Sequence, residues 1–137
     1  MNPLVPLLIL APPTPPRNDV VSDAFAAAHA IAVREIADAP RRIPHARFRL
    51  LASMGALGRS DLMSLRAGLL LPGPPPKDAL RTVTLDFGAV RRLPKGHLAM
   101  DASVIYGPRG GFRAHYVVDP SRGPDGAVVS RSVFLRY

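Results

Sequence analysis

The stretch TVTLDFGAV, residues 82–90, decides the fold, because apolar and polar side chains alternate along it. Strict alternation is the period of a β-strand with one face on a hydrophobic core. The side chains expected on the buried face are Val83, Leu85, Phe87 and Ala89, with Thr82, Thr84 and Asp86 opposite. The stretch therefore predicts a half-buried strand.

Three further segments after this strand have the same character. Residues 97–106 alternate in the same way, and the loop GPRGG leads into residues 112–119. The turn PSRGPDG then leads into residues 127–136. Four consecutive strands with short connections predict an antiparallel meander.

The first half of the chain predicts helices. Residues 20–37 carry apolar side chains at helical spacing on one face, namely Val21, Phe25, Ala28, Ala32 and Ile36, and Pro40 ends the pattern. Residues 47–54, RFRLLASM, are predicted helical, and residues 60–71 helical or irregular. Prolines exclude a helix from Leu4 to Ala11, which is expected to be an extended edge segment.

These elements predict one α+β domain over residues 1–137, an antiparallel β-sheet meander of about four to five strands with two to three helices packed on it. A proline-rich connector is expected at 12–19 and an apolar, proline-rich loop at 69–77. The absence of cysteine excludes disulfides and thiolate metal sites. The start MNPLVPLLIL has no basic residue before its apolar run, which argues against a signal peptide. No stretch approaches the roughly 18 apolar residues that cross a bilayer.

The charge is strongly basic, with 18 Lys+Arg against 10 Asp+Glu and a net charge of +8. Such a chain favours polyanionic partners such as nucleic acid, phosphoprotein or acidic lipid. The preference for arginine over lysine could equally reflect GC-rich coding.

Catalytic motifs are missing from the sequence, including a nucleophile elbow, a P-loop and a dinucleotide-binding glycine pattern. The four histidines, His29, His45, His97 and His115, stand singly, and the acids are dispersed. We therefore expect a binding protein with no catalytic, cofactor or metal residues. An enzyme would need a deep pocket in which His45 or His115 meets an acid.

Two segments are candidate functional surfaces. Residues 39–60 contain no carboxylate, so Arg41, Arg42, Arg47 and Arg49 form either a solvated face or a contact for acidic lipid or nucleocapsid. Leu69, Leu70 and Leu71 form either a helix end in the core or an exposed patch for self-association or membrane insertion.

The order of several motifs resembles the globular core of rhabdovirus matrix proteins of the vesiculovirus type. The motifs are an apolar segment at 4–11, SDAFAAA at 22–28, RIP at 42–44, FRLLASMG at 48–55, and RRLPKG at 91–96 before a strand that ends in Ile105-Tyr106. The family's long lysine-rich arm and its helical insertion after the strand are absent here. Membrane binding would then rest on the folded domain.

The resemblance implies a non-enzymatic viral matrix protein of a negative-strand RNA virus. Such a protein self-assembles under the envelope, bridges the nucleocapsid and the inner membrane leaflet, and drives assembly and budding. Its place would be the virion, the host cytoplasm and the inner face of a host membrane. The implied partners are other copies of itself, the viral nucleocapsid and an anionic membrane. The alternative is a small basic nucleic-acid-binding protein, although Phe48 is the only aromatic residue in the basic segment available for base stacking.

Overall fold

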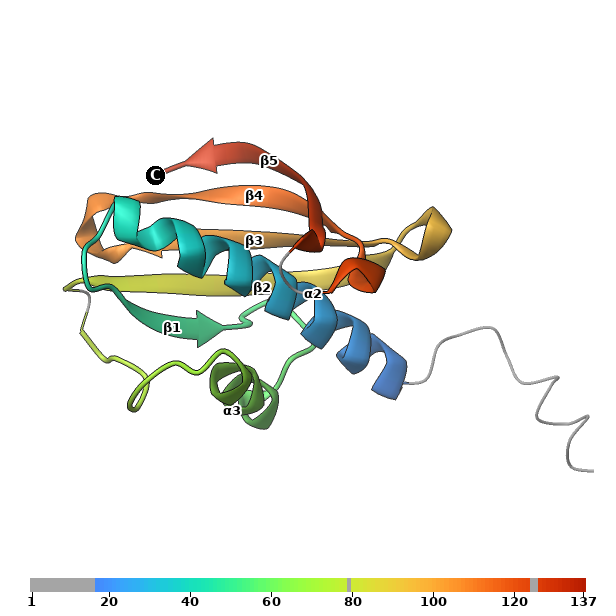
Figure 1. Cartoon of the computed structure of the whole chain (residues 1–137), viewed down its shortest axis with the longest axis horizontal. Helices are drawn as coiled ribbons and strands as arrows, with labels where there is room; N and C mark the ends of the chain where they lie inside the picture. Colours follow the sequence, from blue (N-terminus) through green and yellow to red (C-terminus); the bar gives the residue numbers. More distant parts are fainter. Residues whose placement is uncertain (1–16, 79, 124–125) are drawn as a thin grey trace, which may run out of the picture.

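A five-stranded sheet with the order β1-β2-β3-β4-β5 forms the centre of the computed structural model, which describes residues 17–78, 80–123 and 126–137 (Figure 1). The strands are β1 (Arg47–Leu51), β2 (Thr82–Arg92), β3 (Leu98–Tyr106), β4 (Gly111–Val118) and β5 (Val128–Arg136). Strands β2 to β5 form the predicted antiparallel meander, and β1 lies parallel to β2. The predicted α+β class is confirmed. The expected edge segment at Leu4–Ala11 lies outside the described residues.

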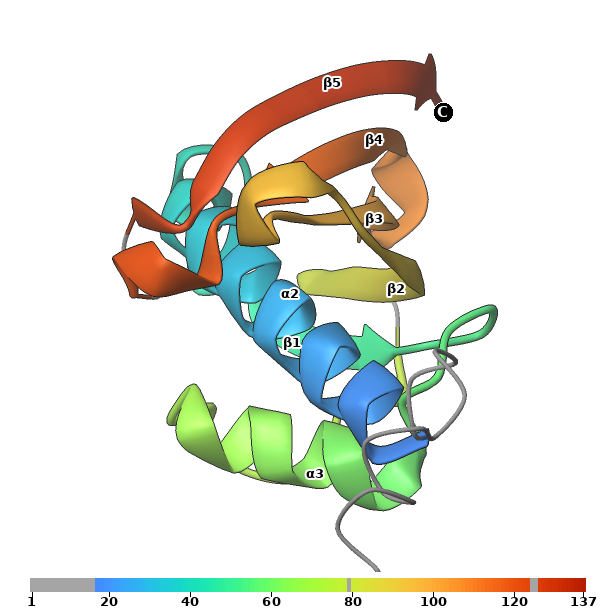
Figure 2. The same cartoon turned by 90° about the vertical axis from the view of Figure 1, so that its right-hand side faces the viewer.

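Helix α2 (Arg17–Asp38) crosses one face of this sheet (Figure 2). It packs through alanines and one isoleucine that are almost fully buried, namely Ala24, Ala27, Ala28, Ile31 and Ala32. Small side chains let the helix axis approach the sheet closely. The helix begins at Arg17, so the connector expected at 12–19 is wrong for its last three residues. The negative charge of Asp19 stabilises the first turn of the helix.

Strand β1 corrects the helix predicted at 47–54. The segment RFRLL alternates, so that Phe48 and Leu50 face the helices and lie opposite Val83 and Leu85. Pairing with β2 satisfies the backbone of this short segment, which is too short to sustain an isolated helix. Parallel neighbours need a crossover, and α3 (Arg59–Gly68) lies in this connection, as the sequence allowed.

A bulge in β2 corrects the predicted position of Ala89. Val83, Leu85 and Phe87 are buried as predicted, but the register with β3 shifts between Phe87 and Val90. The extra residue breaks the alternation and leaves Ala89 exposed. Gly88 is required at the bulge, because a Cβ there would lie 2.8 Å from the carbonyl oxygen of Asp101.

The core lies between α2 and the sheet face that it covers. On β4 the buried residues alternate through Phe112, Ala114, Tyr116 and Val118. Helix α3 lies beside α2 near the β1 edge (Figure 2). On the opposite face of the sheet Asp101, Arg113 and His115 are partly exposed, whereas Thr84 and Ser103 are buried. The two helices thus leave one sheet face and the β5 edge open.

Candidate functional site: a cationic pocket at the end of the sheet

A pocket of about 380 Å³ lies at one end of the sheet. Three segments meet there because β1 and β2 begin, and the antiparallel β3 ends, at the same end. The lining residues are Arg42, Ile43, Pro44, His45, Leu80, Arg81, Tyr106, Gly107 and Pro108. We call this the end pocket. Its lining is mostly apolar, with two arginines and one histidine.

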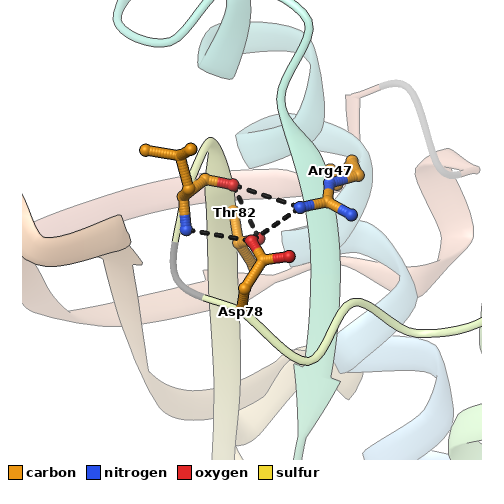
Figure 3. A network of polar contacts seen from close by, with 4 residues as sticks. Arg47, Asp78 and Thr82 are labelled. Atoms are coloured by element: carbon orange, nitrogen blue, oxygen red, sulfur yellow. Dashed lines mark hydrogen bonds and ion pairs between the residues drawn. The ribbon is translucent and has the colours of Figure 1, made fainter.

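The segment before β2 is fixed by polar contacts around Arg47 (Figure 3). The Arg47 guanidinium donates to the Asp78 carboxylate at 2.7 Å and to the Leu80 carbonyl at 3.3 Å. The Leu80 N–H also donates to Asp78, and the Thr82 hydroxyl donates to the Leu80 carbonyl. The hydrogen bond from Arg47 lowers the pKa of Asp78. This network positions one wall of the end pocket.

Two lining residues have a left-handed backbone conformation that residues other than glycine rarely adopt. The φ angle is 56° at His45 and 53° at Arg81. Such a conformation costs roughly 1–2 kcal/mol per residue, and strained residues cluster at functional sites. The Arg81 carbonyl is held by the Arg47 N–H at 2.8 Å, which helps to offset this cost.

The electrostatic balance of the end pocket is positive. Arg42, His45 and Arg81 line it, and no carboxylate is among the lining residues. The Arg42 guanidinium lies 5.0 Å from the centre of the Tyr106 ring and 5.7 Å from that of Phe112. These cation–π contacts hold the cation without neutralising it. Burial raises the pKa of Tyr106.

A buried polar cluster lies behind this aromatic wall. The Glu35 side chain is 1% exposed and accepts a 2.6 Å hydrogen bond from the Tyr116 hydroxyl. Arg131 approaches the same oxygen at 3.3 Å, within ion-pair range but without hydrogen-bond alignment, and stacks on Phe112 at 4.6 Å. Burial and the neighbouring Glu35 charge raise the pKa of Tyr116. The single carboxylate of this cluster is thus matched to Arg131, and Arg42 has no ion-pair partner in the described part of the chain.

The four predicted contact arginines do not form one surface. Arg42 lines the end pocket, and Arg41 is exposed beside it on the short helix η1 (Ala39–Arg41). Arg47 is engaged by Asp78. Arg49 is part-buried and donates to the Thr84 hydroxyl at 3.2 Å on the open sheet face. Strand β1 separates the four, because it directs residues 47 and 49 to that face.

The three predicted leucines also differ from one another. Leu70 is 87% exposed and has a φ angle of 56°, whereas Leu69 and Leu71 pack partly against the core. The loop that follows is held by Arg66, which is 7% exposed. Its guanidinium donates to the Phe48 carbonyl and to those of residues 72–74. Sequence reasoning missed Arg66, because nothing in the local pattern marks it as buried.

A second polar cluster, of which the sequence suggested only His115, lies on the open sheet face. The Asp101 carboxylate lies 2.7 Å from Nδ1 of His115, and Arg113 donates to the Ser103 hydroxyl at 3.0 Å. His115 therefore does meet an acid, but in a surface hollow where the two side chains are 39% and 42% exposed. His45 lines a pocket without an acid. The deep acid–histidine pocket that an enzyme would need is not seen among the described residues.

The described residues contain no group of three or more potential metal ligands. Within the same residues, no helix combines the length and apolar character needed to cross a membrane. Comparison with family models, curated proteins and solved structures finds no match to this chain. The class defined by fold and site is therefore an α+β domain with a cationic end pocket, and its function must be inferred from that pocket.

Proposed function

We propose that this domain binds a small ligand that combines an anionic group with an apolar portion, and that it binds this ligand in the end pocket. The observation that carries the proposal is the composition of the lining, which gathers Arg42, His45 and Arg81 without a carboxylate. An anion entering the pocket would meet uncompensated positive charge. Binding modules and enzymes both use such sites, but the lining contains no paired nucleophile and base, which favours recognition over catalysis.

The size and shape of the end pocket support a small molecule. Its volume of about 380 Å³ lies within the range of roughly 300–1,000 Å³ typical of ligand sites. A carboxylate or phosphate group suits the planar fork of an arginine. The apolar portion would contact Ile43, Pro44 and the Tyr106 ring. Stacking on Tyr106 already orders the Arg42 side chain, which reduces the entropy lost on binding.

The test compares benzyl phosphate, benzoate and benzyl alcohol as probes of the full chain, with binding followed by amide chemical shifts. We expect the two anions to shift residues 42–45, 80–81 and 106–108, and the alcohol to bind at least about tenfold more weakly. Arg42→Gln should weaken anion binding about tenfold or more. The matched control Arg41→Gln changes the neighbouring exposed arginine and should have less than about a twofold effect. Equal binding of anion and alcohol, or equal effects of the two variants, would overturn the proposal.

The second candidate is self-assembly on an acidic surface, the matrix function that the family resemblance implies. One observation favours it: Leu70 is 87% exposed at a turn whose neighbours are anchored in the core. An apolar side chain held out from the body is suited to a contact with another subunit or a membrane. The net charge of +8 would draw the protein to acidic lipid or nucleocapsid.

Assembly is tested by light scattering at low salt and by flotation with phosphatidylserine vesicles. Leu70→Asp should block assembly and leave the fold intact, whereas Ser64→Asp adds the same charge on an exposed α3 position and should assemble as wild type. A parallel RNA titration examines the nucleic-acid alternative, which predicts tight binding with a steep salt dependence. The matrix function would be excluded if the wild-type protein stayed monomeric and did not bind the vesicles.

A further inference from the structure

The free edge of β5 is a surface that the end pocket does not use. β5 is the last strand in the sheet order, so β4 pairs with one of its edges and the described residues leave the other open. Eight large hydrophobic residues are exposed among the described residues. Four of them, Val129, Phe134, Leu135 and Tyr137, lie on β5 or directly after it. The open edge therefore coincides with the densest apolar exposure in the part of the chain that the structure describes.

The backbone of this edge can accept another strand. The Tyr137 N–H donates to the Gly111 carbonyl of β4 at 2.9 Å, so alternation directs the Arg136 N–H to the free side. The edge at the other side of the sheet, β1, has only five residues and lies beside α3. β5 has nine residues, and its bulges near Val129 and Phe134 flank a regular central stretch. An open, extended and apolar edge is a template for strand addition.

The charge of β5 determines which kind of peptide strand its free edge can bind. β5 and its flanking residues 127 and 137 carry Arg131 and Arg136 and no aspartate or glutamate side chain. Arg131 is matched to Glu35, but Arg136 is exposed, and the partly exposed Arg113 lies on the adjacent strand β4. Two β5 edges from two copies would bring like charges together, which disfavours self-pairing.

We propose that the β5 edge binds an extended peptide of alternating acidic and apolar residues as a sixth strand. The peptide backbone would pair with the free amides and carbonyls of β5. Its apolar side chains would cover Leu135 and Tyr137 on one face of the sheet, and its carboxylates, on the other face, would meet Arg136. Main-chain pairing supplies the affinity of this recognition mode, and the side chains supply its specificity.

The probes are two short synthetic peptides, one of alternating valine and glutamate and one of alternating valine and lysine. Fluorescence anisotropy with the full chain should show the glutamate peptide binding at least about tenfold tighter. Binding should slow hydrogen exchange at residues 130–136. Arg136→Glu and Leu135→Ser should each weaken binding about tenfold. Arg59→Glu, an equal charge change on exposed α3, should weaken it less than about threefold.

Two results would overturn this assignment. The first is equal binding of the two peptides, or equal effects of Arg136→Glu and Arg59→Glu. The second is a concentration-dependent dimer that Leu135→Ser abolishes. That result would mean that the β5 edge pairs with a second copy of the chain. Thermal unfolding of each variant shows whether it remains folded. Arg42→Gln should leave peptide binding unchanged, so this test does not depend on the end pocket.

Discussion

Replacing Tyr116 by phenylalanine removes one hydroxyl from the buried cluster and keeps the ring. The hydroxyl donates to the Glu35 carboxylate at 2.6 Å, and neither residue is more than 1% exposed. A hydrogen bond to a charged group contributes roughly 1.5–3 kcal/mol, and a buried acceptor left without its donor adds a desolvation penalty. We therefore expect the free energy of unfolding to fall by about 2–3 kcal/mol, without a cavity term because the ring remains.

Urea unfolding followed by circular dichroism measures this change, and the melting temperature should fall by about 6–12 °C for a chain of this length. Glu35→Gln leaves Arg131 without its counter-charge and should cost more, about 3–5 kcal/mol. Because the two residues share a bond, the double variant should lose at least about 1 kcal/mol less than the sum of the single losses. A loss below about 0.5 kcal/mol for Tyr116→Phe, or full additivity, would refute the reasoning.

Three further predictions concern stability. Gly111→Ala places a Cβ against the Val104 carbonyl and should cost about 3 kcal/mol in urea unfolding, whereas Gly68→Ala meets open space at a helix end and should be neutral or stabilising by up to about 1 kcal/mol. Arg92→Ala breaks an exposed 2.6 Å ion pair and should cost less than about 1 kcal/mol, a value that 0.5 M salt should reduce further. The raised pKa values of the two buried tyrosines mean that the unfolded chain deprotonates first, so stability should be retained below about pH 10 and fall above it in a pH series of melts. Tyr116→Phe should flatten that fall.

The strands of the second half of the chain could be predicted because apolar and polar residues alternate over most of their length, and Gly- and Pro-rich turns separate most of them. Strand β1 could not be predicted, because RFRLL is only five residues long and its partner strand β2 begins 35 positions further on, at Thr82. Short apolar segments are ambiguous between helix and strand until tertiary pairing decides. The exposure of Ala89 depends on a register shift that involves β3, which no pattern within β2 reveals.

The end pocket could be anticipated only in part. The absence of acids from residues 39–60 pointed to Arg42, and His45 lies in the same segment, but Arg81 and Tyr106 come from two other segments that meet it only through the sheet register. Glu35 carried a usable signal, because it stands at helical spacing from the buried Ala28 and Ile31. An acid on the apolar stripe of a helix predicts a buried partner, although the sequence alone does not say which cation or hydroxyl supplies it.

The buried Glu35 also has a consequence for how the protein is made. The residue that donates to it, Tyr116, lies 81 positions further along the chain. During translation α2 therefore leaves the ribosome long before β4 and β5 exist, with an alanine face and a carboxylate that nothing yet covers. Its docking must wait until residues 116 and 131 have emerged, so folding is delayed to the late stages of synthesis and is exposed to chaperones and proteases until then.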